Sequence, residues 1–198
     1  EWGALVTELG GDKVEIFTAI GPLKNPDHVL VTPALIGAMK DASLLVCTGA
    51  DYEGEWLPGA LKRAQNPKMA AGQPGLFYAR DFIETLADDH TKDDHKKDGH
   101  LHGSGNPHVQ GDPYRIRIIA GQLAQRLIQI DPSNATVYKK NTTTFIRELG
   151  TLIKNLEKKA APLSRNNIVA QAKHSVYLLS WLKIYSAAIV EPVVGVPP

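Results

Sequence analysis

Three histidines stand where their imidazole rings can be held outward from the chain. His28 ends Asn25-Pro26-Asp27-His28, His108 ends Gly105-Asn106-Pro107-His108, and His174 follows the apolar run Ile168-Val169-Ala170. A proline fixes its own φ and restricts the residue before it, so a ring on such a turn is not drawn into a core. Neutral imidazole is a ligand that suits Zn²⁺. If the three rings meet in one cleft, they form a zinc site that ties distant parts of the chain together.

Composition describes an ordinary globular chain and excludes several classes of function. The 198 residues are 43% hydrophobic, which is enough for one large domain or one and a half. A net charge of +1 gives no electrostatic reason to bind nucleic acid or a membrane surface. The single cysteine, Cys47, ends the apolar run Leu44–Val46, where a buried structural thiol is expected. No stretch approaches the roughly 18 apolar residues of a membrane span.

The first half of the chain alternates between strand and helix patterns. Val14–Ile20 alternates as a strand, and Ser43–Cys47 is typical of a buried strand in a parallel sheet. Pro33–Met39 and Leu57–Ala64 are predicted as short helices. This order favours an α/β fold with parallel-type sheets flanked by helices.

Two longer helices begin with the same signal. Asp112-Pro113 and Asp131-Pro132 each offer a side-chain cap followed by proline at the first helical position. The predicted apolar stripes are Ile116, Ala120, Leu123 and Leu127 in the first helix, and Tyr138, Phe145, Leu149, Leu152 and Leu156 in the second. The second helix should run to about Ala161, before Pro162, and span roughly 45 Å. That length suits a rigid strut between two lobes.

A second lobe is expected to begin after this helix. Asn167–Gln171 and Ala187–Val190 are predicted strands, with a helix at Val176–Leu182 between them. We therefore divide the chain into an N-terminal metal-binding lobe (1–130), a connecting helix (131–162) and the beginning of a C-terminal lobe (163–198).

The segment 88–105 has a composition of its own. It contains His90, His95, His100 and His102 but one apolar residue, so it cannot bury a face and is expected to be a surface loop. Two interpretations stay open. The segment is either a solvated run of charges or a loop that collects zinc weakly and transiently.

Several passages together resemble a known family. They are Leu9-Gly10-Gly11-Asp12-Lys13-Val14, Asn25-Pro26-Asp27-His28, Ala42–Ala50, Gly105–Val109 followed by Asp112-Pro113, Asp131-Pro132-Ser133-Asn134, and Glu191–Pro198. These passages resemble the metal-specific solute receptors of bacterial ABC importers, the zinc and manganese cluster of periplasmic binding proteins. The resemblance implies two α/β lobes joined by a rigid helix, with a metal held between them by His28, His108 and His174. It also implies a membrane permease as partner, a monomer, and a periplasmic or lipid-anchored extracytoplasmic location.

The sequence departs from that pattern in two places. Asp27 separates Pro26 from His28, whereas the usual first motif places histidine directly after proline. Most of the second lobe is not present before Pro198, so we interpret the chain as a fragment. The fourth ligand stays open between Asp27, a water molecule, a loop histidine such as His102, and a carboxylate beyond residue 198.

The predicted function is capture of a transition metal, with Zn²⁺ favoured over Mn²⁺, and its delivery to a permease. The alternatives are a zinc-dependent hydrolase using the three histidines and a metal-buffering or adhesive surface protein. The chain has no His-Glu-x-x-His, and His100-Leu101-His102 lacks the Asp-His continuation of binuclear hydrolases, so an enzyme is not predicted. Asp51, Glu53 and Glu55 are interpreted as surface or supporting groups near the helix start at Trp56 rather than as catalytic acids.

The histidine-rich segment should be dispensable for tight binding. Deletion of residues 88–103 is expected to leave high-affinity zinc binding nearly intact, because a segment that must be ordered on binding contributes little affinity. Titration calorimetry on the deletion variant measures this. Loss of the high-affinity phase would move the primary site into the segment.

Overall fold

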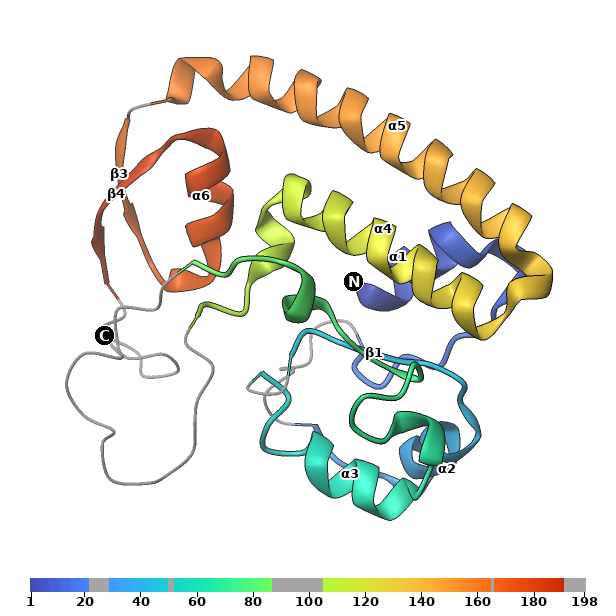
Figure 1. Cartoon of the computed structure of the whole chain (residues 1–198). Coiled ribbons are helices and arrows are strands. Elements are labelled where there is room, and N and C mark those ends of the chain that lie inside the picture. The colour runs from blue at the N-terminus through green and yellow to red at the C-terminus, as the bar shows by residue number, and fades with distance from the viewer. Residues whose placement is uncertain (22–28, 50–51, 87–104, 165, 191–198) are drawn as a thin grey trace. The chain divides into compact units, whose positions relative to one another are not determined.

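The computed structural model describes residues 1–21, 29–49, 52–86, 105–164 and 166–190 (Figure 1). The chain forms two compact units. The first contains residues 1–84 and 118–145, and the second contains residues 85–117 and 146–198. The boundary falls inside two helices, α4 (Pro113–Ile130) and α5 (Ala135–Ala160), so each helix contributes residues to both units.

The first unit is built around a short parallel sheet. Strand β1 (Leu45–Cys47) pairs with β2 (Leu76–Tyr78), with Leu45 opposite Leu76 and Cys47 opposite Tyr78. The helices are α1 (Trp2–Gly10), α2 (Pro33–Asp41) and α3 (Leu57–Ala64), with short 3-10 turns at Gly11–Lys13, Pro67–Met69 and Ala79–Phe82. Parallel pairing with intervening helices confirms the predicted α/β architecture of this part of the chain.

Helices α2 and α3 pack with β1 into one core. Its buried members are Leu35, Met39, Cys47, Trp56, Leu57, Ala60 and Ala64. The Cys47 side chain is 4% exposed, and burial raises the pKa of its thiol well above the ordinary value. A neutral, buried thiol of this kind serves packing rather than metal binding.

The predicted strand at Val14–Ile20 is wrong. These residues have no regular secondary structure, and Ile16 and Phe17 are 37% and 57% exposed. Alternation alone does not make a strand, because a strand also needs a partner for its backbone hydrogen bonds. The segment instead follows helix α1, which ends where Gly11 takes a positive φ of 59°.

The second unit contains a strand–helix–strand motif. Strand β3 (Asn167–Ala170) leads through the 3-10 turn η8 (Lys173–Ser175) into α6 (Val176–Leu182), and β4 (Tyr185–Ile189) then pairs in parallel with β3. The unit also contains the 3-10 turns η5 (Val109–Gly111) and η7 (Ala161–Leu163). The helix at Val176–Leu182 is confirmed as predicted, and both strands lie within two residues of their expected bounds.

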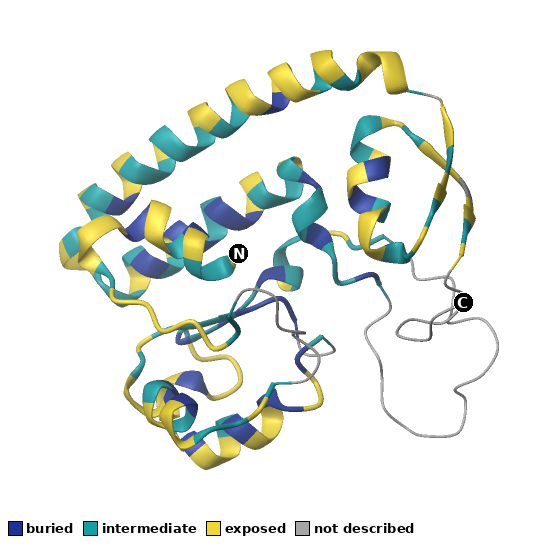
Figure 2. Ribbon diagram, turned by 180° about the vertical axis from the view of Figure 1, so that it is seen from behind, coloured by how far each residue is buried: buried dark blue, intermediate teal, exposed yellow. Residues whose placement is uncertain are grey.

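The apolar stripe of α5 differs from the predicted one near its end. Figure 2 shows exposed and half-buried residues along most of this helix. Leu152 and Leu156 are 51% and 37% exposed, whereas Ile153 is 3% exposed. Steps of four residues from Phe145 through Leu149 lead to Ile153, so the buried line continues there rather than stepping by three to Leu152.

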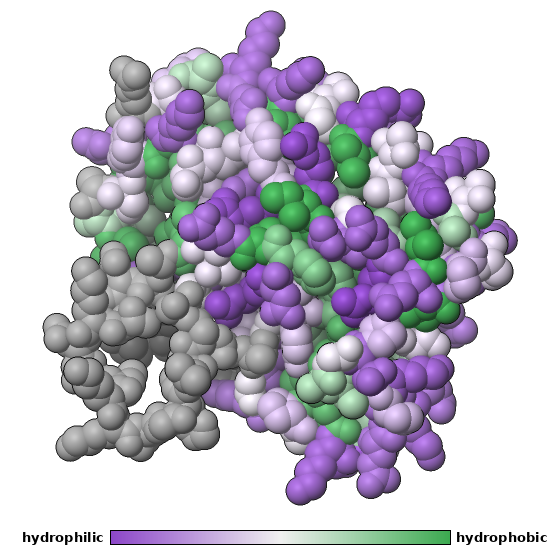
Figure 3. Space-filling model, viewed as in Figure 1, coloured by the Kyte–Doolittle hydropathy of each residue, from purple (hydrophilic) through white to green (hydrophobic). Residues whose placement is uncertain are grey.

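The surface is mixed in polarity. Figure 3 shows hydrophilic side chains over much of the visible face, with apolar side chains gathered in smaller patches between them. Within the described residues, every helix is too short or too polar to cross a bilayer.

Helix α5 begins with a cluster of side chains around Asp131. The Asp131 carboxylate accepts hydrogen bonds from Ser133 Oγ at 2.5 Å, Asn134 Nδ2 at 2.6 Å and Tyr138 Oη at 2.7 Å. These bonds, that of Ser133 foremost, lower the pKa of Asp131 to about 2. The cluster holds the start of the helix while the carboxylate is charged.

Asp131→Asn should lower the melting temperature at neutral pH, because a neutral amide oxygen accepts the Asn134 and Tyr138 hydrogen bonds more weakly than a charged carboxylate does. The folded-state pKa lies below the unfolded one, so the carboxylate stabilises the fold above about pH 4 and loses that effect as pH falls toward 2. Melting temperatures from pH 6 to 2 should therefore fall more steeply for the wild type than for the variant. Asp41→Asn, at an exposed carboxylate, is the control and should follow the wild type. Coincident profiles for Asp131→Asn and the wild type would contradict this account.

Candidate metal centre

Two of the three predicted ligands lie together in the second unit. The imidazole rings of His108 and His174, 66 residues apart in sequence, have centroids 4.3 Å apart and meet edge to face at 79°. His108 is half-buried and His174 is exposed. Two imidazole rings this close together can each offer a nitrogen to one transition-metal ion.

The remaining predicted ligands lie outside the described residues. These are His28, the alternative fourth ligand Asp27, and the histidines His90, His95, His100 and His102. Within the residues that the structure describes, no group of three or more His, Cys, Asp or Glu side chains is arranged to hold a metal ion. The described part of the candidate site is therefore a pair of histidines.

His108 is presented by a turn directly before helix α4. The Asn106 Oδ1 atom accepts a hydrogen bond from the His108 backbone N at 2.9 Å, and His108 then caps η5. Asp112 closes the segment: its Oδ1 accepts from the Tyr114 backbone N at 2.8 Å, and its carboxylate pairs with Arg115. The Asp112-Pro113 signal therefore places His108 just before a capped helix.

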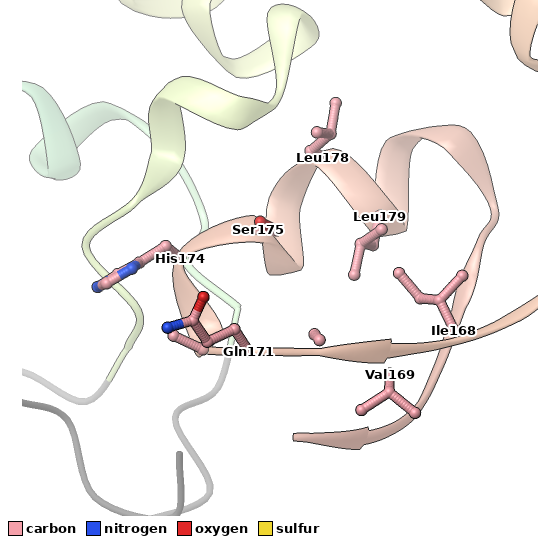
Figure 4. Close-up of a pocket in the computed structure, with 9 residues that line it drawn as sticks. Ile168, Val169, Gln171, His174, Ser175, Leu178 and Leu179 are labelled. Atoms are coloured by element: carbon pink, nitrogen blue, oxygen red, sulfur yellow. The ribbon is translucent and has the colours of Figure 1, made fainter. Parts of the chain in front are cut away.

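His174 lies in η8, between β3 and α6. An open pocket of about 460 Å³ is lined by residues of β3, η8 and α6, His174 among them. Figure 4 shows the His174 ring projecting away from Leu178 and Leu179, while Leu179 points toward the strand that contains Ile168. The helix is thus held to the strand by its apolar side, which leaves the ring free of the core.

Close packing brings η5 and α6 together in this unit. A Cβ placed on Gly111 would lie 3.0 Å from the backbone N of Leu178, so a larger residue there would push the two segments apart. The side chain of Val109 is fully buried. The two histidine-bearing segments are therefore fixed by packing as well as by hydrogen bonds.

Glu53 has the supporting role, rather than the surface role, of the two predicted for it from the sequence. It is 4% exposed, and its two carboxylate oxygens accept hydrogen bonds from the backbone N atoms of Thr48 (2.8 Å) and Gly49 (3.0 Å). Burial raises its pKa above the ordinary value. Glu53 thus holds the turn after β1 in the first unit. The one signal for this in the sequence is a glutamate placed six residues after Cys47, the last residue of β1.

Comparison with known families assigns the class of protein. Residues 1–197 match the family model described as ZnuA, zinc-uptake complex component A, periplasmic. The chain therefore belongs to the ZnuA family of periplasmic metal-binding components of ABC importers. This confirms the resemblance drawn from the sequence, including the extracytoplasmic location.

Individual relatives are distant in sequence but similar in fold. The metal ABC transporter substrate-binding lipoprotein SsaB of Streptococcus sanguinis is 22% identical over 187 residues, which are 93% of this chain and 55% of SsaB. A crystal structure of ZnuA matches with a TM-score of 0.79 at 21% identity, over 98% of this chain and 68% of that one. A cadmium-bound periplasmic metal-binding protein from Candidatus Liberibacter asiaticus matches with a TM-score of 0.77 at 20% identity, over 99% and 67%.

These matches show the class of protein and how much of each relative's length this chain covers. The family comprises substrate-binding components rather than enzymes, so the hydrolase alternative is not favoured. The chain spans about half the length of the curated relative and about two thirds of the length of the solved structures.

Removing either ring of the histidine pair should strongly reduce zinc affinity. Loss of an outer-shell partner of a metal ligand typically costs 10–100-fold in affinity, so loss of a ligand should cost at least about 100-fold. We expect this for both His108→Ala and His174→Ala in competition titrations against a chromophoric zinc chelator. Gln171→Ala, an exposed pocket residue beside His174, is the matched control and should bind zinc as the wild type does. Wild-type affinity in both histidine variants would place the zinc site elsewhere.

Proposed function

We propose that this chain captures Zn²⁺ outside the cytoplasm and delivers it to an ABC permease. The single observation that supports this most is the His108–His174 pair, whose ring centroids lie 4.3 Å apart in a chain of the ZnuA family. On the sequence alone, His28 is proposed as the third ligand. The fourth position is proposed for Asp27, water, a loop histidine such as His102, or a carboxylate beyond residue 198.

The preference for zinc rests on the ligand type. Imidazole nitrogen suits Zn²⁺, whereas Mn²⁺ favours sites richer in carboxylate and water oxygen. Proteins of similar structure bind zinc, nickel, cadmium or manganese, so similarity by itself leaves the metal open. The two imidazole rings of His108 and His174 are therefore our reason to propose zinc rather than manganese.

A metal carrier differs from a zinc enzyme in how it coordinates the ion. A carrier holds its ion in closed coordination, without the open position at which a zinc hydrolase activates a water molecule for catalysis. We propose that 1–130 is the N-terminal lobe, 131–162 the connecting helix and 163–198 the beginning of the C-terminal lobe. A helical connection limits hinge bending, so release to the permease should involve a small shift of the lobes. The receptor is proposed to act as a monomer.

Zinc should stabilise the folded chain more than manganese does. A ligand that binds the native state alone raises the melting temperature by mass action, and the tighter ligand raises it more at equal concentration. Thermal melts of the full chain with no metal, with zinc and with manganese measure the order. The same melts on His108→Ala should lose most of the zinc effect. A manganese shift equal to or larger than the zinc shift would contradict the metal assignment.

A further inference from the structure

We propose that Asn106 is the positioning residue of the zinc site: its side chain holds His108 and His174 at their working separation before the metal arrives. The proposal rests on the proposed function, because it concerns the same pair of rings. Asn106 itself is not proposed to touch the metal.

The Asn106 amide connects the two histidine-bearing segments. Its Oδ1 accepts from the backbone N of His108 at 2.9 Å, and its Nδ2 donates to the backbone O of Lys173 at 3.1 Å. Lys173 directly precedes His174. One planar group thus fixes the backbone of one ligand and of the residue next to the other.

Burial makes the two side-chain hydrogen bonds of Asn106 hard to replace. Asn106 is 2% exposed, so water cannot readily replace a lost partner, and an unpaired amide group there would be costly. The fully buried Tyr177 holds the backbone of Asn106: its hydroxyl donates to the Asn106 backbone O at 2.8 Å and accepts from Leu86 N at 2.9 Å. The Arg115 guanidinium lies 4.9 Å from the centre of the Tyr177 ring. The support is therefore continuous from α6 to the turn that presents His108.

A second asparagine uses the same geometry in the first unit, which contains neither His108 nor His174. Asn66 also precedes a proline, and its Oδ1 accepts from the backbone N two residues later, Lys68, at 3.0 Å. Its Nδ2 donates to the backbone oxygens of Met39 and Ala42, both at 2.8 Å. Asn66 belongs to the first unit and contacts no histidine-bearing segment in those bonds. The Asn-Pro turn thus occurs in both units, and at Asn106 it holds the two backbone segments that carry the His108 and His174 rings.

The consequence is a half-site that is organised before binding. Rings already fixed near each other lose little freedom when they bind one ion, so less of the binding energy goes into ordering them. Partners outside the first shell of a metal site typically contribute 10–100-fold to affinity in this way. Asn106 should therefore matter to affinity without being a ligand.

The test compares matched substitutions at the two asparagines. Asn106→Ala is expected to weaken zinc affinity 10–100-fold, whereas Asn66→Ala should lower the melting temperature but leave zinc affinity unchanged. Asn106→Asp keeps the acceptor for His108 N and the shape of the side chain but loses the donor to Lys173. Its added negative charge would by itself attract a cation, so a drop in zinc affinity in this variant indicates positioning. Asn66→Asp is its control.

Two further readouts separate positioning from stability. In the metal-free chain, proton NMR should show nuclear Overhauser contacts between the His108 and His174 rings in the wild type and in Asn66→Ala, and these should be lost in Asn106→Ala. In a His174→Ala background, Asn106→Ala should cost much less zinc affinity than it does in the wild type, because one of the rings it positions is gone.

The outcomes distinguish the two proposals. If His108→Ala and His174→Ala leave zinc binding unchanged, the proposed function fails at this site. If those variants lose zinc but folded Asn106→Ala and Asn106→Asp bind it as tightly as the wild type, the positioning role of Asn106 is overturned alone. Should Asn106→Ala not fold, Asn106→Asp and its Asn66→Asp control decide the same question.

Discussion

The contact between the His108 and His174 rings depends on one buried amide. Asn106 bonds to His108 N on one side and to Lys173 O on the other, with Tyr177 behind it. Local propensity cannot bring the centroids of these rings to 4.3 Å, because helices α4 and α5 and strand β3 separate the two histidines in the sequence. This amide joins two segments of the second unit. One is the strand–helix–strand motif, which contains Lys173, and the other is the turn before the capped start of α4, which contains His108.

In the first unit, polar side chains also hold turns in place, at positions other than His108 and His174. Glu53 binds the backbone N atoms of Thr48 and Gly49 after β1, and Asn66 joins the end of α2 to the segment after α3. In both units, short strands are followed by turns that buried polar side chains hold in place. Turns fixed in this way can present metal ligands rigidly. Less of the binding free energy is then used to order the ligand side chains.

Much of the fold was predictable because its signals are local. Proline at the first turn of α2, the Asp112-Pro113 cap of α4 and the apolar runs of β1 and β3 act over a few residues. The three-residue strand β2 and helix α1 were not predicted, and the strand predicted at Val14–Ile20 was wrong. Whether such short segments form a strand or a helix depends on pairing or packing with residues that are distant in the sequence. The local sequence indicates His108 and His174 as candidate ligands, and the structure brings their two rings together. The amide that joins them could not be identified in this way, because Asn106 and Lys173 are 67 residues apart.

The central claim is that histidine nitrogens hold the metal, and the pH dependence of zinc affinity tests it most directly. Histidine must be neutral to bind zinc, and imidazole ordinarily takes up a proton near pH 6.5, so protons compete with the metal as pH falls. Carboxylates protonate near pH 4 and would keep their metal through this range. Zinc affinity of the full chain should be measured by competition titration between pH 5 and 7. We predict that the logarithm of affinity rises with pH more steeply than a single proton allows; a slope near zero would contradict the three-histidine site.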